Sequence, residues 1–151
     1  MIIGIVGAEA AKFTKVGEAQ ARWMMRQLLS TDGVTLCVSG GCHLGGADIY
    51  AEEEAAALGI PMRVHKPADR SWEGGYKARN ILIAQDADLL YNFVVDVLPE
   101  TYSGTRSPFC YHCKTTDHVK SGGCWTAKYA ATLGKEVYWA RIRNHPTGDH
   151  Q

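Results

Sequence analysis

The sequence has no long hydrophobic run and no excess of charge of either sign. Its 151 residues include 16 Lys and Arg against 16 Asp and Glu, so the formal net charge is +0. This balance excludes the strong, unspecific attraction to polyanions on which many duplex DNA-binding proteins depend. No apolar stretch approaches the roughly 20 residues that a membrane-spanning helix needs. We therefore expect no membrane span and no general nucleic-acid surface.

The amino-terminal stretch lacks the features of a signal peptide. It reads M-I-I-G-I-V-G, which contains no basic residue and leads directly into an apolar segment typical of a strand. We therefore expect a cytoplasmic protein. In that compartment the 5 cysteines would be reduced thiols or metal ligands and not disulfides.

Two common nucleotide-binding motifs are also absent. The first loop, G-A-E-A-A-K-F-T, does not contain the G-x-G-x-x-G dinucleotide motif, and the chain has no G-x-x-x-x-G-K-[ST] phosphate loop. These absences disfavour a standard dehydrogenase and a P-loop NTPase. The length suggests one domain over residues 1–142, with an inserted loop at about 98–124 and a polar tail at 143–151 that we expect to fray.

Strand-like and helix-like segments alternate along the chain. Strands are expected at 2–6, 34–38, 62–65, 88–95 and 136–142, and helices at 16–29, 47–58, 75–86 and 122–133. The helical period of the first helix places Val16, Trp23 and Leu28 near one face. Such alternation predicts an α/β fold, a three-layer sandwich with helices on both faces of a parallel sheet. We expect the strand order 3-2-1-4-5.

Glycine pairs precede two of the expected helices. Residues 39–48 read S-G-G-C-H-L-G-G-A-D, and residues 121–123 read S-G-G. Amides at a helix start are unpaired and favour anions, so we expect these stretches to form two walls of a phosphate pocket. Arg79 and Asn80 would contact the phosphate, ribose or base. The predicted ligand-binding residues are Gly7, Ser39, Gly40, Gly41, Gly45, Gly46, Asp48, Arg79, Asn80, Ser121, Gly122, Gly123 and Thr126.

Cysteine and histidine gather in the long loop before the last helix, with the spacing C-x2-C-x4-H-x5-C. Three thiolates and one imidazole are the ligand set of a closed tetrahedral zinc site. We therefore predict a structural zinc held by Cys110, Cys113, His118 and Cys124, which stabilises a loop too long to fold without a core. His112 is an alternative to His118. A nucleophilic Cys124 paired with either histidine is an alternative to the metal site.

The motifs together resemble those of the SLOG superfamily of Rossmann-like nucleotide-binding proteins. S-G-G-x-x-x-G-G-A-D, then A-E-E-x-A-x-x-x-G-I-P and a later K-A-R-N helix start, are similar to motifs of this group. It includes the lonely-guy phosphoribohydrolases, the DNA-processing protein DprA and the YspA-like proteins, and the resemblance is to the YspA-like branch. It implies a Rossmann-like fold, a nucleotide or nucleotide-derived ligand at the carboxyl ends of the strands, and a homodimer.

Three positions depart from the lonely-guy signature P-G-G-x-G-T-x-x-E. The matching stretch S-G-G-C-W-T-A-K-Y keeps Gly122, Gly123 and Thr126. Ser121 replaces the proline, Trp125 replaces the third glycine, and Tyr129 stands where those enzymes have their catalytic glutamate. Backbone amides can still bind phosphate, whereas acid–base catalysis needs a carboxylate. We therefore expect a nucleotide-binding protein. The alternatives are a hydrolase acting on an N-glycosidic or phosphate bond of a nucleotide, and a nucleic-acid-associated zinc module.

Other side chains near the expected pocket have several possible roles. Asp48 is a carboxylate that could replace the missing glutamate, or it could complement the dipole of its helix. Glu9 could hydrogen-bond a ribose or be solvated. Trp72 and Tyr76 could stack on a base, or pack as ordinary aromatic residues.

Overall fold

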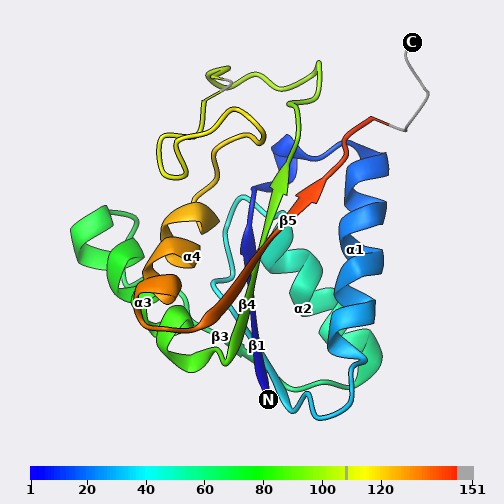
Figure 1. Ribbon diagram of the computed structural model, residues 1–151, viewed down its shortest axis with the longest axis vertical. Coiled ribbons are helices and arrows are strands. Elements are labelled where there is room, and N and C mark those ends of the chain that lie inside the picture. The colour runs from blue at the N-terminus through cyan, green and yellow to red at the C-terminus, as the bar shows by residue number, and fades with distance from the viewer. Residues whose placement is uncertain (108, 146–151) are drawn as a thin grey trace.

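The computed structural model describes residues 1–107 and 109–145. Its elements, in chain order, are β1 (Ile2–Gly7), η1 (Ala10–Lys12), α1 (Lys15–Leu29), β2 (Leu36–Ser39), α2 (Ala47–Leu58), β3 (Met62–Val64), η2 (Trp72–Tyr76), α3 (Lys77–Asp86), β4 (Leu89–Val95), α4 (Gly123–Thr132) and β5 (Glu136–Ile142). The five strands form one parallel sheet in the order β3-β2-β1-β4-β5. The predicted α/β fold and strand order are confirmed (Figure 1).

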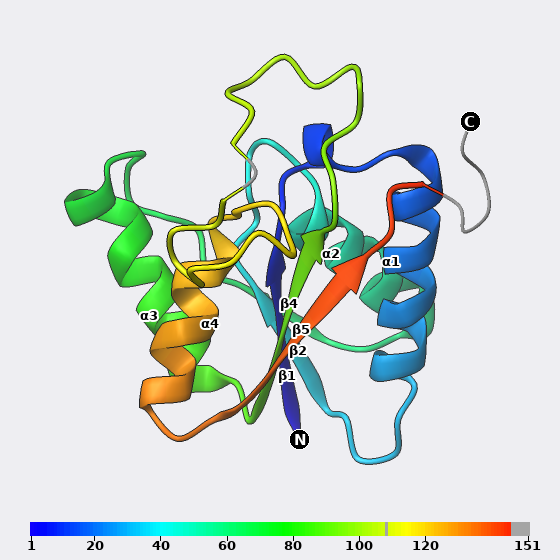
Figure 2. The ribbon, with the colours of Figure 1, turned by 45° about the horizontal axis from the view of Figure 1, so that its top comes forward.

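Helices cover both faces of the sheet, α1 and α2 on one side and α3 and α4 on the other (Figure 2). Within β1, Ile3 and Ile5 belong to one buried cluster, whereas Val6 belongs to the second. A strand buried on both faces needs apolar residues at successive positions, which is why this segment does not alternate. No helix among those described is both long enough and apolar enough to cross a bilayer.

Helix α1 buries a different face from the one that its sequence indicated. Its buried residues are Gly17, Ala21, Met25 and Leu29. Val16 and Trp23 are instead 46% and 57% exposed. The helix lies so close to the chain after β5 that a β-carbon on Gly17 would be 2.2 Å from Asn144 Oδ1. The face that carries Val16 and Trp23 is therefore not the buried one, because close packing selects the face with small residues.

The helix expected at 75–86 is preceded by the π-helical turn η2. Ser71 caps this turn, since its Oγ accepts a hydrogen bond from Gly74 N at 2.9 Å. Gly75 then approaches the backbone so closely that a β-carbon there would lie 1.9 Å from the carbonyl oxygen of Asp69. A glycine is therefore required at this position, and the wide turn places the residues of η2 beside the carboxyl ends of the strands.

The chain after β5 is anchored at Asn144, where fraying was expected. This side chain is 1% exposed. Its Nδ2 donates to the carbonyl oxygen of Lys12 at 2.8 Å, and its Oδ1 accepts from Thr14 N at 3.0 Å. Its backbone N–H donates to a carboxylate in the loop after β4. One asparagine thus joins three segments at the carboxyl edge of the sheet. The remainder of the predicted tail, residues 146–151, lies outside the described residues.

A buried carboxylate links the two helices on one face of the sheet. Glu54 of α2 is paired with Arg22 of α1 at 3.0 Å and with Arg26 at 2.9 Å. Burial by itself raises the pKa of Glu54, but the hydrogen bonds from Arg26 and Arg22 outweigh it and hold the pKa below its ordinary value. The contribution of this cluster to stability is therefore present above the unfolded-state pKa and is lost as the pH falls through the folded-state pKa.

Replacing Glu54 with Gln should lower the free energy of unfolding by about 2 kcal/mol at pH 7, because two guanidinium groups lose a buried partner. Urea unfolding at pH 7 and at lower pH is the measurement, and the difference between wild type and variant should shrink as the wild-type carboxylate becomes protonated. Glu53→Gln is the matched control, because Glu53 also pairs with Arg22 but its side chain is 56% exposed. Equal losses in the two variants would contradict the prediction.

Candidate functional site

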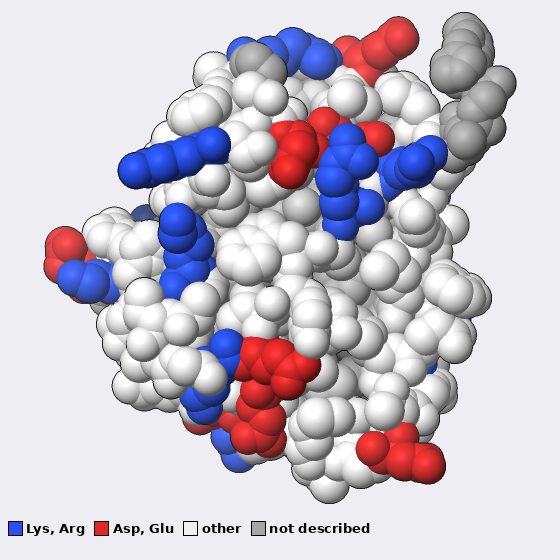
Figure 3. Space-filling view, viewed as in Figure 1, with Lys and Arg blue, Asp and Glu red and all other residues white. Residues whose placement is uncertain are grey.

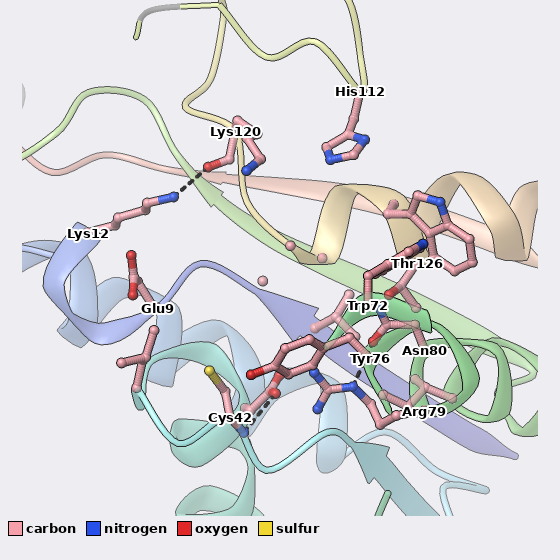
Figure 4. Close-up of a pocket in the computed structure, with 18 of the residues that line it drawn as sticks. Glu9, Lys12, Cys42, Trp72, Tyr76, Arg79, Asn80, His112, Lys120 and Thr126 are labelled. Atoms are coloured by element: carbon pink, nitrogen blue, oxygen red, sulfur yellow. Dashed lines mark hydrogen bonds between the residues drawn. The ribbon is translucent and has the colours of Figure 1, made fainter. Parts of the chain in front are cut away.

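A cavity of about 610 Å³ opens beyond the carboxyl ends of the central strands β1 and β4 (Figure 4). Its walls come from the loop after β1, the glycine loop at 39–48, η2 and α3, the long loop before α4, and the first turns of α4. Parallel sheets of this kind bind ligands at the point where the connections of two neighbouring strands leave toward opposite faces. The cavity occupies that point.

Asp48 and Arg79 hold the glycine loop in place. Asp48 Oδ2 accepts a hydrogen bond from the backbone of Cys42 at 3.1 Å. Arg79 donates through Nη1 to the carbonyl oxygen of Gly40 at 2.5 Å and through Nε to Asn80 Oδ1 at 2.7 Å. Burial raises the pKa of Asp48, and the nearby guanidinium of Arg79 opposes this shift. Arg79 therefore supports one wall of the cavity while its side chain lines it.

The first turn of α4 packs directly against the sheet. A β-carbon on Gly123 would lie 2.5 Å from Asn92 Oδ1 and 2.6 Å from the backbone nitrogen of Gly7. Only glycine allows this approach, which brings the helix start to the edge of the cavity with its unpaired amides. Asn92 Nδ2 donates to Cys124 Sγ at 3.4 Å, whereas its buried Oδ1 has no hydrogen-bond partner among the described residues.

Aromatic side chains form the wall near α4. The Trp72 and Trp125 rings meet edge to face at 4.9 Å, and Trp125 stacks on Tyr129 at 5.3 Å. Tyr129, which by its sequence motif was predicted to lie where lonely-guy enzymes have their glutamate, packs against the apolar cluster under α3 and α4. The outer member of this aromatic stack, Trp72, lines the cavity with Tyr76.

Four side chains of the predicted metal site lie together, with their ligand atoms all within 4.8 Å of one another: Cys110, Cys113, His118 and Cys124. Cys124 Sγ is 3.8 Å from Cys110 Sγ and 3.8 Å from His118 Nε2. A tetrahedral ion with metal–sulfur bonds of about 2.3 Å places neighbouring sulfur ligands about 3.8 Å apart. The cluster can therefore hold a metal ion with little rearrangement.

Neighbouring groups set the orientation of His118 and the protonation of Cys113. Asp117 Oδ1 lies 2.6 Å from His118 Nδ1, which turns Nε2 toward the thiols, as second-shell carboxylates do in metal sites. Burial and the nearby thiols of Cys124 and Cys110 raise the pKa of Cys113 to about 12 in the metal-free protein. A bound cation reverses this preference by stabilising the thiolates. His112 is not in the cluster and instead lines the cavity.

The structure distributes the predicted ligand-binding residues over three places. Those that line the cavity are Gly7, Asp48, Arg79, Asn80, Gly122, Gly123 and Thr126. Gly41 and Gly45 line an adjoining cavity of about 540 Å³. Ser39, Gly40, Gly46 and Ser121 line neither of these two cavities. Ser121 Oγ lies 3.6 Å from Cys124 Sγ, so this serine faces the metal cluster. The role of every residue in this set stays a prediction.

Several side chains that line the cavity were not among the predicted ligand-binding residues, including Lys12, Tyr111, Lys120 and Trp125. Lys12 follows β1 by a few residues, so its place in the first βα loop was a usable signal. Tyr111 and Lys120 flank metal ligands, and only the folding of the long loop over the strand ends brings them to the cavity. Figure 4 shows Lys12 and Lys120 at one end and Trp72 at the other.

Comparison with known proteins concerns the fold. No protein-family model matches the sequence, and no curated protein matches it. The molybdenum cofactor carrier protein of Chlamydomonas reinhardtii is similar in structure, with a TM-score of 0.60 at 18% identity over 91% of this chain and 74% of the carrier. DNA processing protein A (DprA) of Streptococcus pneumoniae has a TM-score of 0.59 at 14% identity, over 91% of this chain and 49% of DprA. The fold is Rossmann-like.

The metal site is tested by exchanging its histidine. His118→Gln should reduce the bound metal from one ion per chain to well below one and lower the melting temperature by several degrees, since the ion holds the long loop. Elemental analysis and thermal unfolding are the measurements. His112→Gln is the matched control in the same loop and should keep both values. Full metal content in His118→Gln would contradict the assignment.

The start of α4 is tested by a pair of adjacent glycines. Gly123→Ala should lower the free energy of unfolding by about 2 kcal/mol, because its β-carbon meets buried backbone and Asn92. Gly122→Ala should change stability by less than about 0.5 kcal/mol, because no atom lies within 4 Å of its β-carbon. Chemical unfolding at pH 7 measures both. Similar values for the two variants would show that α4 does not pack as described.

Proposed function

We propose that the protein binds a nucleotide or a nucleotide-derived small molecule in the cavity beyond β1 and β4. The observation that carries this proposal is the meeting of three kinds of group in one cavity. The start of α4 offers backbone amides, Asn80 offers a buried polar side chain, and Trp72 and Tyr76 offer aromatic rings. These groups suit a phosphate, a ribose or base edge, and a base plane respectively.

The structural comparison agrees with small-molecule binding. The carrier protein with a TM-score of 0.60 is named for a cofactor that it carries, and its fold resembles that of this chain. The low identity of 18% means that the likeness supports a kind of site and not a particular ligand. The nucleotide assignment depends instead on the groups in the cavity and on the resemblance of the glycine and K-A-R-N motifs.

We further propose that the metal ion is zinc with a structural role. Three thiolates and one imidazole are a common zinc ligand set, and a closed site with four protein ligands leaves no position for a substrate. The burial of Cys110, Cys124 and His118 supports a closed site. This geometry disfavours a nucleophilic Cys124, because its sulfur already lies against two other ligands.

The resemblance to the SLOG superfamily, and to its YspA-like branch, also suggests the setting of the protein. We propose a homodimer in the cytoplasm. Light scattering coupled to size-exclusion chromatography tests the dimer.

Two alternatives are weighed by particular observations. Asp48 is a buried carboxylate in the cavity with a raised pKa, which favours a hydrolase that uses it as an acid. Against this, Asp48 Oδ2 already accepts a backbone hydrogen bond.

A nucleic-acid-associated module would need a basic surface. On the face in Figure 3, acidic and basic side chains are interspersed, and much of the centre carries neither.

Nucleotide binding is tested with Trp72, whose side chain is 40% exposed on the cavity wall. A panel of ribonucleoside mono- and diphosphates should raise the melting temperature of the wild type, and titration calorimetry should show about tenfold weaker binding by Trp72→Leu, since a base loses its stacking partner. Trp23→Leu is the control, because Trp23 is exposed on α1 outside the cavity. Chromatography of the same mixtures should recover the nucleotides intact, and release of base or phosphate would favour the hydrolase.

A further inference from the structure

Two lysines meet at the end of the cavity that lies away from the aromatic wall. Lys12 comes from η1 and Lys120 from the long loop, 108 residues later, and Lys12 Nζ donates to the carbonyl oxygen of Lys120 at 2.8 Å. Figure 4 shows Lys12 near Glu9 and Lys120 on the side of His112, with Trp72 and Asn80 at the opposite end. The folding of the long loop therefore builds a cationic end into the cavity.

Neither ammonium group is neutralised by an ion pair with a carboxylate in the described part of the chain. Lys120 Nζ lies over the ring of Tyr111 at 5.3 Å, which orients it without removing its charge. Burial lowers the pKa of Lys12, Glu9 raises it and Lys120 lowers it, so that the net shift is downward. Two lysines against the single carboxylate of Glu9 at this end of the cavity attract a further anion.

The position of this cationic end relative to the other groups indicates what the anion is. The amides of Gly122 and Gly123 at the start of α4 suit a first phosphate, and the aromatic wall suits a base. A second anionic group on the same ligand would reach the lysines. We propose, on the basis of the proposed function, that Lys12 and Lys120 bind a second phosphoryl group. The protein then selects nucleoside diphosphates or other pyrophosphate-containing nucleotides over monophosphates.

The metal cluster and the lysine subsite share one segment of the long loop. Lys120 lies between the ligands His118 and Cys124 in the sequence, and its carbonyl oxygen is the group that positions Lys12. Loss of the metal ion releases the segment that carries both the ammonium of Lys120 and this carbonyl. Preference for the second phosphoryl group therefore depends on the metal, whereas the base-binding wall formed by η2 does not.

Calorimetric titration compares each ribonucleoside monophosphate with its diphosphate, using the base that gives the tightest binding. The wild type should bind the diphosphate about tenfold more tightly, and Lys12→Gln and Lys120→Gln should each reduce this ratio to about twofold or less. Lys120→Gln keeps the backbone carbonyl that Lys12 uses, so it tests the charge even if Lys12→Gln unfolds the loop. Lys135→Gln is the control, because Lys135 also donates to a backbone carbonyl but lies beyond the far end of α4.

The outcomes separate the subsite from the proposed function. Monophosphate and diphosphate binding with equal affinity to the wild type, or an unchanged ratio in both lysine variants, would overturn the subsite and leave nucleotide binding standing. Absence of binding by every nucleotide would overturn both. In chelator-treated protein with verified loss of metal, a fall of the ratio toward one with monophosphate affinity retained would support the link to the metal. A preserved ratio would refute that link.

Discussion

Close packing between Gly123 and the pair Gly7 and Asn92 brings the start of α4 against the ends of the two central strands. The next residue, Cys124, is a member of the metal cluster, and Asn92 donates to its sulfur. One turn therefore carries the first amides of α4 at the edge of the cavity and a thiol of the Cys/His cluster in the long loop. A displacement of this turn would open the cavity and distort the cluster together.

The long loop between β4 and α4 has little core of its own. Its buried residues include Cys110, His118, Val119 and Ser121. Arg106 adds hydrogen bonds to three backbone carbonyls within the loop, and Val119 N donates to Val95 O at the end of β4 at 2.8 Å. The hydrogen bond from Val119 to Val95 ties the end of the loop to β4, and the cluster joins Cys110 and Cys113 to His118 and Cys124.

The basic side chains that line the cavity differ in how the protein engages them. Arg79 is engaged by Gly40 and Asn80 and lies near Asp48, so it holds the glycine loop. Arg79 is therefore engaged by the protein itself, whereas Lys12 and Lys120 at the opposite end form no ion pair with a carboxylate in the described part of the chain. Tyr129 stacks on Trp125 beside the aromatic wall of the cavity.

Local sequence patterns correctly predicted the ends of several elements, the strand order and the residues of the Cys/His cluster. The sequence predicted the bounds of α2 and β5 correctly, because Gly59 ends the helix and Gly134 precedes the strand. It also predicted the strand order and the four cluster residues, since alternation and ligand spacing are local. Only the tertiary structure decided which face of α1 is buried, how η2 widens its turn, and that Lys12 meets Lys120. These depend on how closely distant segments approach, and no pattern within one segment encodes that distance.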